Sequence, residues 1–346
     1  MKRKGFTLVE LLVVIAIIAL LMSILMPALA RVRALAQRVV CGSHLSSLGK
    51  QLVIYANDQE DRYPRAGGAN SQWGLTLVWD APPAPPTGSP PVEWTAYGIN
   101  STTPGKATIG ACLYYLIKYA DASPKVFNCG SDIGARVFQL SDTLPNQLGT
   151  NQNLLDAWDF GPSNLDPDAT KCPMAPRLYC SYAYQYPFCR LGKPGYFPIN
   201  ALSDSGIAIM ADSSPYLALS TDASWKWFRK KGNTSYAGGT EEQDRFGNSP
   251  NHKGDGQNVL YNDGHVSWSD VAYCGFDGDN IYSMANTKGG TTTLVPSVGY
   301  IFPVSTTNGG TQRCFTPIDG FRPISKTDSL LINEGLDQGG ITALGS

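Results

Sequence analysis

Four side chains that can bind a metal or move protons lie close together in the chain: His252, Asp255, Asp263 and His265. Imidazole nitrogens and carboxylate oxygens are common ligands of zinc and related metals. A structural interpretation competes with this one, in which Asp263 shapes a turn and His252 hydrogen-bonds loop backbone. We favour the structural interpretation and predict no metal at these residues. General acid–base catalysis is the least expected role.

A single carboxylate, Glu10, lies in an apolar run near the N-terminus. Residues 11–30 carry no charge, and twenty helical residues span about 30 Å, the thickness of a bilayer's hydrocarbon core. Lys2, Arg3 and Lys4 precede the run, so the positive-inside rule predicts one membrane pass with a cytoplasmic N-terminus. A carboxylate in such a segment costs about 2.5–3.5 kcal/mol and usually has a partner and a role. The alternative is that Glu10 reaches the membrane interface.

The elements that position these residues begin with a long helix. Apolar residues recur at three- and four-residue steps from Val32 to Tyr55, and a polar stretch from Asn57 predicts the helix end near residue 57. Such a stripe normally faces a core, so its expected partner is the chain's own sheet. Pro27 has no N–H, and we expect the helix to kink or loosen there. A second apolar helix, predicted over 109–119, is expected to pack on the sheet.

A β-hairpin is predicted around Asp263 and Gly264. The flanking segments 257–261 and 265–269 alternate in polarity, and an Asp-Gly pair between such runs is a strong hairpin signal. Residues 207–212, IAIMAD, indicate a buried strand. The predicted fold class is therefore α+β, with a long N-terminal helix, half transmembrane and half amphipathic, packed on an antiparallel β-sheet with disulfide-tied loops.

The eight cysteines fit an exported protein, because an even count in such a chain suggests disulfides. Their pairing cannot be chosen from sequence. No Cys-x-x-Cys pair is present, which argues against a zinc site. Cys41 lies on the predicted helix and is either unpaired or ties the helix to the rest of the chain. The remaining cysteines are the disulfide candidates: Cys112, Cys129, Cys172, Cys180, Cys189, Cys274 and Cys314.

Composition also indicates a loop-rich protein of one or two domains. Its 346 residues include 36 glycines and 24 prolines, charged residues make up only 16%, and the net charge is -1. This balance gives no reason to expect a nucleic-acid partner. Clustered oxygens in Phe276–Asn280 are a calcium candidate, although their spacing does not match an EF-hand loop. No other cofactor is expected.

The N-terminus resembles the leader of type IV prepilins and type II secretion pseudopilins. The cations before Gly5, then Phe6, Glu10 and Pro27, carry this resemblance. It implies that a prepilin peptidase cuts after Gly5 and that the amine of Phe6 is methylated. In this family the fifth residue after the cut is a glutamate that pairs with the N-terminal amine of a neighbouring subunit. Glu10 holds that position here and would set the register of assembly. MPALA, residues 26–30, instead resembles the cleavage site of an ordinary secretory signal.

A wider resemblance, over residues 1–268, is to the prepilin-type processing-associated family of planctomycete-type bacteria. That family carries a His, a nine-residue spacer, and then Asp-Gly-His-Val. Here His252 precedes Asp263, Gly264 and His265, and the spacer has ten residues, one more than the pattern. The role of this motif is left open. Its extra residue casts doubt on any fixed geometry between His252 and Asp263.

The resemblance implies a division of the chain into consecutive parts. Residues 1–5 are the leader and 6–57 the pilin helix, with its transmembrane part at 6–30. Residues 58–274 form an α+β head. Residues 275–346 form a Gly- and Thr-rich extension that adds strands or makes a small subdomain.

The function that the resemblance implies is that of a structural subunit in a pilus or a type II secretion pseudopilus. Its partners would be the peptidase, other pilin subunits and an inner-membrane assembly platform. The subunit would start in the bacterial inner membrane and end in the periplasm or at the cell surface. The alternative is a membrane-anchored module that binds a glycan or secreted substrate. An enzyme is not expected, because no nucleophile motif accompanies the three histidines. The aromatic candidates for such binding are Trp73, Trp79, Trp94, Trp225 and Trp227.

Overall fold

The computed structural model describes the long helix and the core of the head. Features predicted elsewhere, including Gly5, Phe6 and most of the candidate tryptophans, lie outside the described residues. The described residues are 8–66, 72–73, 106–107, 109–132, 135–139, 153–156, 160, 179–187, 199–214, 248–276, 281–282 and 329–332.

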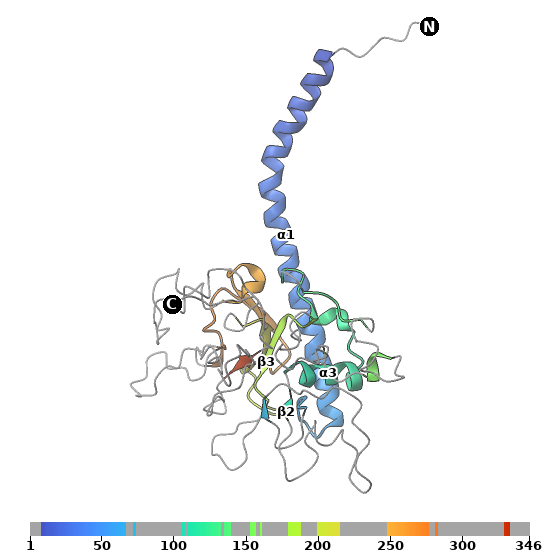
Figure 1. Cartoon of the computed structure of the whole chain (residues 1–346). Helices are drawn as coiled ribbons and strands as arrows, with labels where there is room; N and C mark the ends of the chain where they lie inside the picture. The colour runs from blue at the N-terminus through green and yellow to red at the C-terminus, as the bar shows by residue number, and fades with distance from the viewer. Residues whose placement is uncertain are drawn as a thin grey trace, which may run out of the picture.

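The longest element is helix α1, Leu8–Asp58. Its 51 residues correspond to about 77 Å of helix, and its N-terminal half extends away from the head (Figure 1). The helix ends one residue beyond the predicted boundary, where the polar stretch begins. It continues through Pro27 as one gently curved helix, and the kink or loosening expected at Pro27 stays a prediction.

The head is built on a five-stranded antiparallel sheet. Its order is β6-β5-β4-β3-β7, and the hairpin of β5 and β6 at one edge pairs Leu260 with Val266 and Gln257 with Ser269. This confirms the predicted hairpin and the predicted strand before it. The strands are β3 (Tyr182–Gln185), β4 (Ala208–Asp212), β5 (Gln257–Tyr261), β6 (Val266–Ser269) and β7 (Leu331–Ile332).

The head also contains several shorter elements. Strand β7 comes from the predicted C-terminal extension, so that part of the extension joins the head sheet through β3. A separate parallel pair joins β1 and β2. The remaining elements are β1 (Gln72–Trp73), β2 (Lys106–Ala107), α3 (Ile109–Ala120) and the 3-10 turns η1 (Pro124–Phe127), η3 (Leu154–Asp156) and η5 (Pro250–His252).

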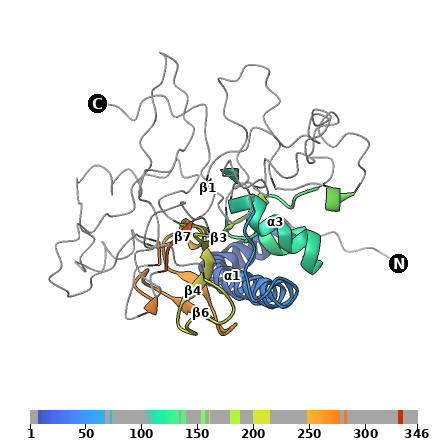
Figure 2. The same ribbon diagram turned by 90° about the horizontal axis from the view of Figure 1, so that it is seen from below.

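The C-terminal half of α1 packs against the sheet on one side and against α3 on another (Figure 2). Helix α3 makes its main contacts with α1, and its buried face belongs to the same hydrophobic core as Tyr182 and Tyr184 of β3. The prediction that it packs on the sheet left out α1 as its main partner. The rings of Tyr115 and Tyr119 lie 6.3 and 6.2 Å from that of Tyr55, and they explain this choice of partner. Aromatic contacts of this kind add to the area that they bury.

Helix α1 approaches the sheet closely at Gly49. A Cβ atom there would lie 2.9 Å from Cδ1 of Leu260 on β5. Leu45, Leu48 and Leu52 flank this point on α1 and are fully buried. Full burial of such a side chain contributes about 1.5–3 kcal/mol, so this stripe fixes the helix on the sheet.

Candidate functional site

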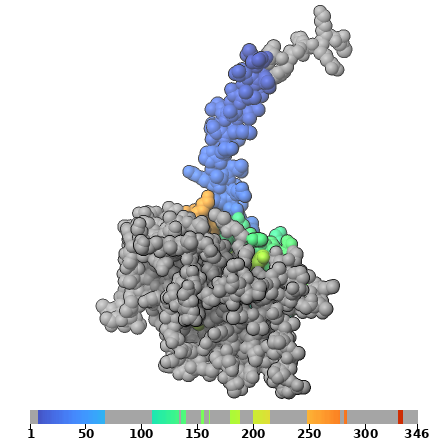
Figure 3. Space-filling model, viewed as in Figure 1, coloured from blue at the N-terminus to red at the C-terminus, as the bar shows by residue number. Residues whose placement is uncertain are grey.

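The N-terminal half of α1 is the most exposed apolar surface in the described part of the chain. Leu8, Met26 and Leu29 are 78%, 70% and 68% exposed. Figure 3 shows this half standing clear of the head. By length and composition it is apolar enough to cross a membrane. Its most apolar stretch of 18 residues has a mean hydropathy of 3.0, and none of that stretch is buried. An exposed apolar surface of this extent requires lipid or other helices around it.

Two of the residues implied in assembly are described. Glu10 lies in the first turn of α1 and is exposed, in the part of the helix where its backbone dipole favours a negative charge. Pro27 lies inside the same exposed half. The cleavage residues Gly5 and Phe6 lie outside the described residues.

A disulfide joins Cys41 of α1 to Cys129, which follows η1. Both residues are buried, and their Cα atoms are 5.2 Å apart. Sequence left open whether Cys41 pairs, and the structure shows that it ties α1 to the head. The bridge spans a sequence separation of 88, for which the chain-entropy relation gives about 4.6 kcal/mol of stabilisation.

The backbone on both sides of Cys129 also bonds to α1. The ring Nδ1 of His44 lies 2.9 Å from the carbonyl oxygen of Asn128, and Gln37 donates to that of Gly130 at 3.1 Å. These contacts flank the bridge and hold the loop along one side of the helix.

The candidate disulfides at Cys112, Cys180 and Cys274 are not present in the structure, where these residues are thiols. Cys112 lies in the core on α3, and its sulfur accepts a hydrogen bond from the Ala66 N–H at 3.3 Å. The other two donate their S–H groups to nearby backbone carbonyls. Three further candidates lie outside the described residues: Cys172, Cys189 and Cys314.

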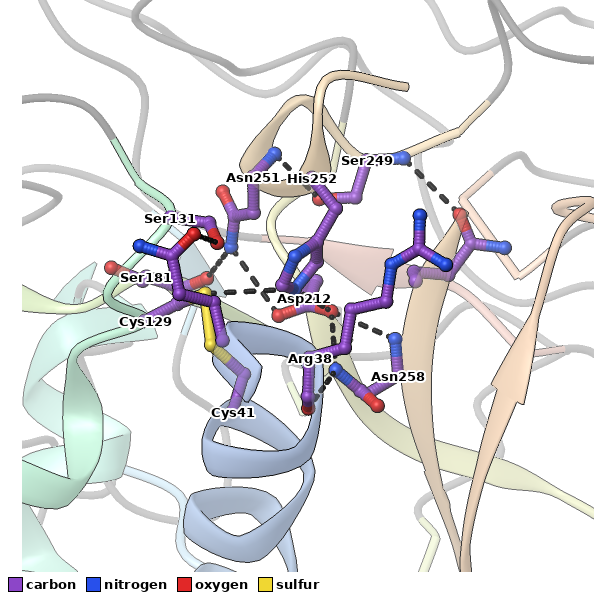
Figure 4. A network of polar contacts seen from close by, with 12 residues as sticks. Arg38, Cys41, Cys129, Ser131, Ser181, Asp212, Ser249, Asn251, His252 and Asn258 are labelled. Atoms are coloured by element: carbon purple, nitrogen blue, oxygen red, sulfur yellow. Dashed lines mark hydrogen bonds and ion pairs between the residues drawn. A yellow bond between two sulfur atoms is a disulfide. The ribbon is translucent and has the colours of Figure 1, made fainter. Parts of the chain in front are cut away.

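His252, the first residue of the motif, faces a carboxylate that sequence analysis did not single out. Its Nε2 lies 3.3 Å from Oδ2 of Asp212, at the end of β4, and 3.6 Å from Sγ of Cys129 (Figure 4). Asp212 is fully buried and His252 is 6% exposed. The expected bond from His252 to loop backbone was therefore wrong. The only sequence signal for Asp212 was an acid ending an otherwise apolar strand.

The Asp212 carboxylate is held by further donors. Its Oδ2 accepts from the backbone N–H of Asn258 at 2.7 Å and from the side-chain amide of Asn258 at 3.2 Å, while its Oδ1 lies 3.4 Å from the amide of Asn251. A buried charge requires such partners, because water is absent from its surroundings. Burial and the nearby Asp212 raise the pKa of Tyr182, which keeps it a donor to the Cys41 carbonyl oxygen.

Two side-chain atoms in this cluster have no hydrogen-bond partner, Oδ1 of Asn251 and Oγ of Ser181. Both residues are buried, and the amide of Asn251 donates to the Ser181 carbonyl oxygen at 2.8 Å. Unsatisfied buried acceptors are uncommon in folded proteins. They mark the cluster as a polar site inside an apolar core.

The loop that carries His252 is anchored to α1 by Arg38. The Arg38 guanidinium lies 4.2 Å from the ring centre of Trp268 and forms an ion pair with Asp255 at 2.9 Å. The Trp268 ring meets the His252 ring edge-on at 5.3 Å. The Trp268 ring thus contacts both the partly buried Arg38 guanidinium and the buried His252 imidazole.

The motif residues do not gather at one point. His252 precedes β5, whereas Asp263 and His265 lie at the turn between β5 and β6, at the opposite end of the hairpin. The metal interpretation based on these residues together with Asp255 therefore fails. The spacer after His252 contains all of β5, which is why it separates the two ends.

The turn itself matches the structural interpretation. Asp263 accepts a hydrogen bond from the backbone N–H of His265 at 3.0 Å, and Gly264 adopts a φ of 87° that favours glycine. This backbone bond lowers the pKa of Asp263. The His265 ring stacks on Tyr261 with the two ring centres 4.4 Å apart. Only Phe276 of the calcium candidate is described.

Comparison with known families gives one match. Residues 1–26 match a family model described as the prokaryotic N-terminal methylation motif. No curated protein and no solved structure matched the chain. The match supports a type IV pilin-like precursor, and it covers the positions of Gly5, Phe6 and Glu10. Membership of the processing-associated family stays a prediction.

Proposed function

We propose that the protein is a pilin-like structural subunit that is cut after Gly5, methylated on Phe6 and assembled through α1. The observation that carries this proposal is the methylation motif at residues 1–26, directly before and within an apolar helix that stands clear of the head. A motif for processing and a surface for helix contacts occur in the same segment.

Before assembly the exposed half of α1 spans the bacterial inner membrane, with its N-terminus cytoplasmic. Removal of the leader by a prepilin peptidase leaves an amine on Phe6 next to the apolar run. Glu10 of one subunit neutralises the amine of its neighbour, which removes the cost of two charges in an apolar surrounding. This pairing sets the register between subunits in a pilus or a type II secretion pseudopilus.

After extraction by an inner-membrane assembly platform, the exposed half of α1 packs with other subunits and the head faces outward. The described contacts support these two roles for α1, packing with other subunits in its N-terminal half and attachment to the head in its C-terminal half. Residues up to Ala36 are largely exposed where described, whereas the helix contacts the head from Gln37 onward and is buried from Cys41. The final location is then the periplasm or the cell surface, and the chain has a structural rather than a catalytic role.

The direct test is the intact mass and N-terminal sequence of the protein made together with a prepilin peptidase. The expected product starts at Phe6 and carries one methyl group. The variant Gly5→Val should keep its leader, while the matched variant Gly130→Ala, where an added Cβ meets nothing within 4 Å, should be processed normally. A retained Met1, or a cut after Ala30, contradicts the proposal. A methylated but strictly monomeric protein would favour the membrane-anchored binding module.

A further inference from the structure

Four metal-binding side chains that the proposed function does not use meet where α1 joins the head. The sulfurs of Cys41 and Cys129, a carboxylate oxygen of Asp212 and a ring nitrogen of His252 all lie within 4.8 Å of one another. All four residues are buried. We propose that, when the two cysteines are thiols, these side chains bind one Zn²⁺ ion.

The distances are close to those of a tetrahedral zinc site. With metal–ligand bonds of about 2.0–2.3 Å, neighbouring ligand atoms in such a site lie roughly 3.3–3.8 Å apart. His252 Nε2 already lies 3.3 Å from Asp212 Oδ2 and 3.6 Å from Cys129 Sγ. Breaking the disulfide allows the two sulfurs to separate to the same range. The site therefore forms with small side-chain movements.

The donor set selects the class of metal. Thiolates, imidazole and carboxylate are all ligands of zinc, whereas calcium and magnesium prefer oxygen ligands alone. All four positions come from the protein and all are buried, which is typical of a closed structural site and not of a catalytic one with an open position.

The surroundings support an ordered carboxylate ligand. The backbone N–H of Asn258 bonds to Asp212 Oδ2 at 2.7 Å, and the amide of Asn251 approaches Oδ1. Partners of this kind orient metal ligands and strengthen binding.

The disulfide and the metal site are alternative states of the same sulfurs. A newly made chain carries two thiols, and each loses one proton to water as its sulfur bonds to Zn²⁺. An oxidised chain returns to the dithiol when a phosphine supplies two electrons. Water then supplies the oxygen of the phosphine oxide and the two thiol protons. Either state holds Cys41 of α1 next to Cys129.

The test uses the full chain in detergent, reduced with a phosphine without oxygen and titrated with Co²⁺, which reports tetrahedral thiolate ligation by its visible absorption. We expect one tightly bound ion per reduced chain, displaced by Zn²⁺, and none in the disulfide form. His252→Ala should weaken binding at least about tenfold. The matched variant His265→Ala, on the exposed turn, should bind as the parent does.

A second measurement covers variants that fold poorly. In the unmutated reduced chain, Zn²⁺ should slow alkylation of Cys41 and Cys129, and a chelator should restore it, while Cys274 alkylates at the same rate throughout. The proposal is overturned if Zn²⁺ protects neither cysteine. It is also overturned if Cys41→Ser or the disulfide form binds Co²⁺ as well as the reduced chain does. Processing at Gly5 plays no part in these results.

Discussion

Nε2 of His252 lies 3.3 Å from Oδ2 of Asp212, inside the core and beside the disulfide that joins helix to head. A neutral imidazole donates to the carboxylate, and a protonated one forms an ion pair with it. In either state His252 supplies a partner that a buried charge requires. The first residue of the motif is therefore part of the junction between α1 and the sheet.

Replacing this histidine should destabilise the protein. His252→Ala leaves the buried Asp212 carboxylate short of one partner, which should lower the free energy of unfolding by about 3 kcal/mol. Chemical denaturation of the full chain in detergent, with the disulfide intact, measures it. His265→Ala should cost less than about 1 kcal/mol, because its ring is 54% exposed and its pairing with Asp263 is open to water. Equal effects of the two changes would show that the buried contact is unimportant.

Gly256 should not tolerate a side chain. Its φ is 148°, and an added Cβ would overlap the Ser269 carbonyl oxygen and lie 2.7 Å from Cζ2 of Trp268. Gly256→Ala should therefore cost about 2–3 kcal/mol and disturb the Trp268 environment. Thermal unfolding followed by tryptophan fluorescence detects both. Gly130→Ala is the control, and an unchanged melting temperature in Gly256→Ala would refute the prediction.

Glu10→Ala should abolish assembly without lowering the amount of protein. The carboxylate lies on the exposed half of α1, so its loss removes no core contact. Sheared surface fractions and electron microscopy measure filaments, and whole-cell immunoblots measure the subunit. Glu60→Ala is the control, since Glu60 is exposed and pairs with the neighbouring Arg62 at 2.8 Å. Normal filaments from Glu10→Ala would remove the basis for register setting.

The hairpin turn should loosen in acid. The pKa of Asp263 is lowered from 3.8 by the His265 N–H, so the carboxylate stabilises the turn above the unfolded-state pKa. That contribution is lost as the pH falls below about 3.8 and through the lower folded-state pKa. The protection of the His265 amide against hydrogen exchange, relative to the intrinsic rate at each pH, should fall in this range. Asp263→Asn should make the exchange independent of this titration, and an unchanged acid response in that variant would count against the assignment.

Local signals predicted the elements well. The Asp-Gly pair at Asp263 and Gly264 specifies a turn by itself, and the predicted hairpin matched the structure. The apolar spacing matched a packed helix face only in its C-terminal part, where Leu45, Leu48 and Leu52 are buried. The earlier part of the stripe was wrongly predicted to face the core, because Val32, Leu35 and Val39 are exposed. The polar stretch from Asn57 placed the end of α1 within one residue.

The junction could not be predicted in the same way. Cys41, Cys129, Asp212 and His252 come from separate elements, and no spacing in the sequence records their meeting. The absence of Cys-x-x-Cys argued against zinc only for ligands that are neighbours in the chain. The partner of α3 was also missed, because apolar periodicity marks a buried face without naming what covers it.

The position of the disulfide along α1 determines how tension would enter the head. Val39 and Val40 are still exposed, and Cys41 is the first fully buried residue of the helix. A force along the exposed half therefore reaches a covalent bond before it reaches Leu45, Leu48 and Leu52. The helix cannot be peeled from the sheet turn by turn starting at this end. Rupture would require the S–S bond, or the loop at Cys129, to fail first.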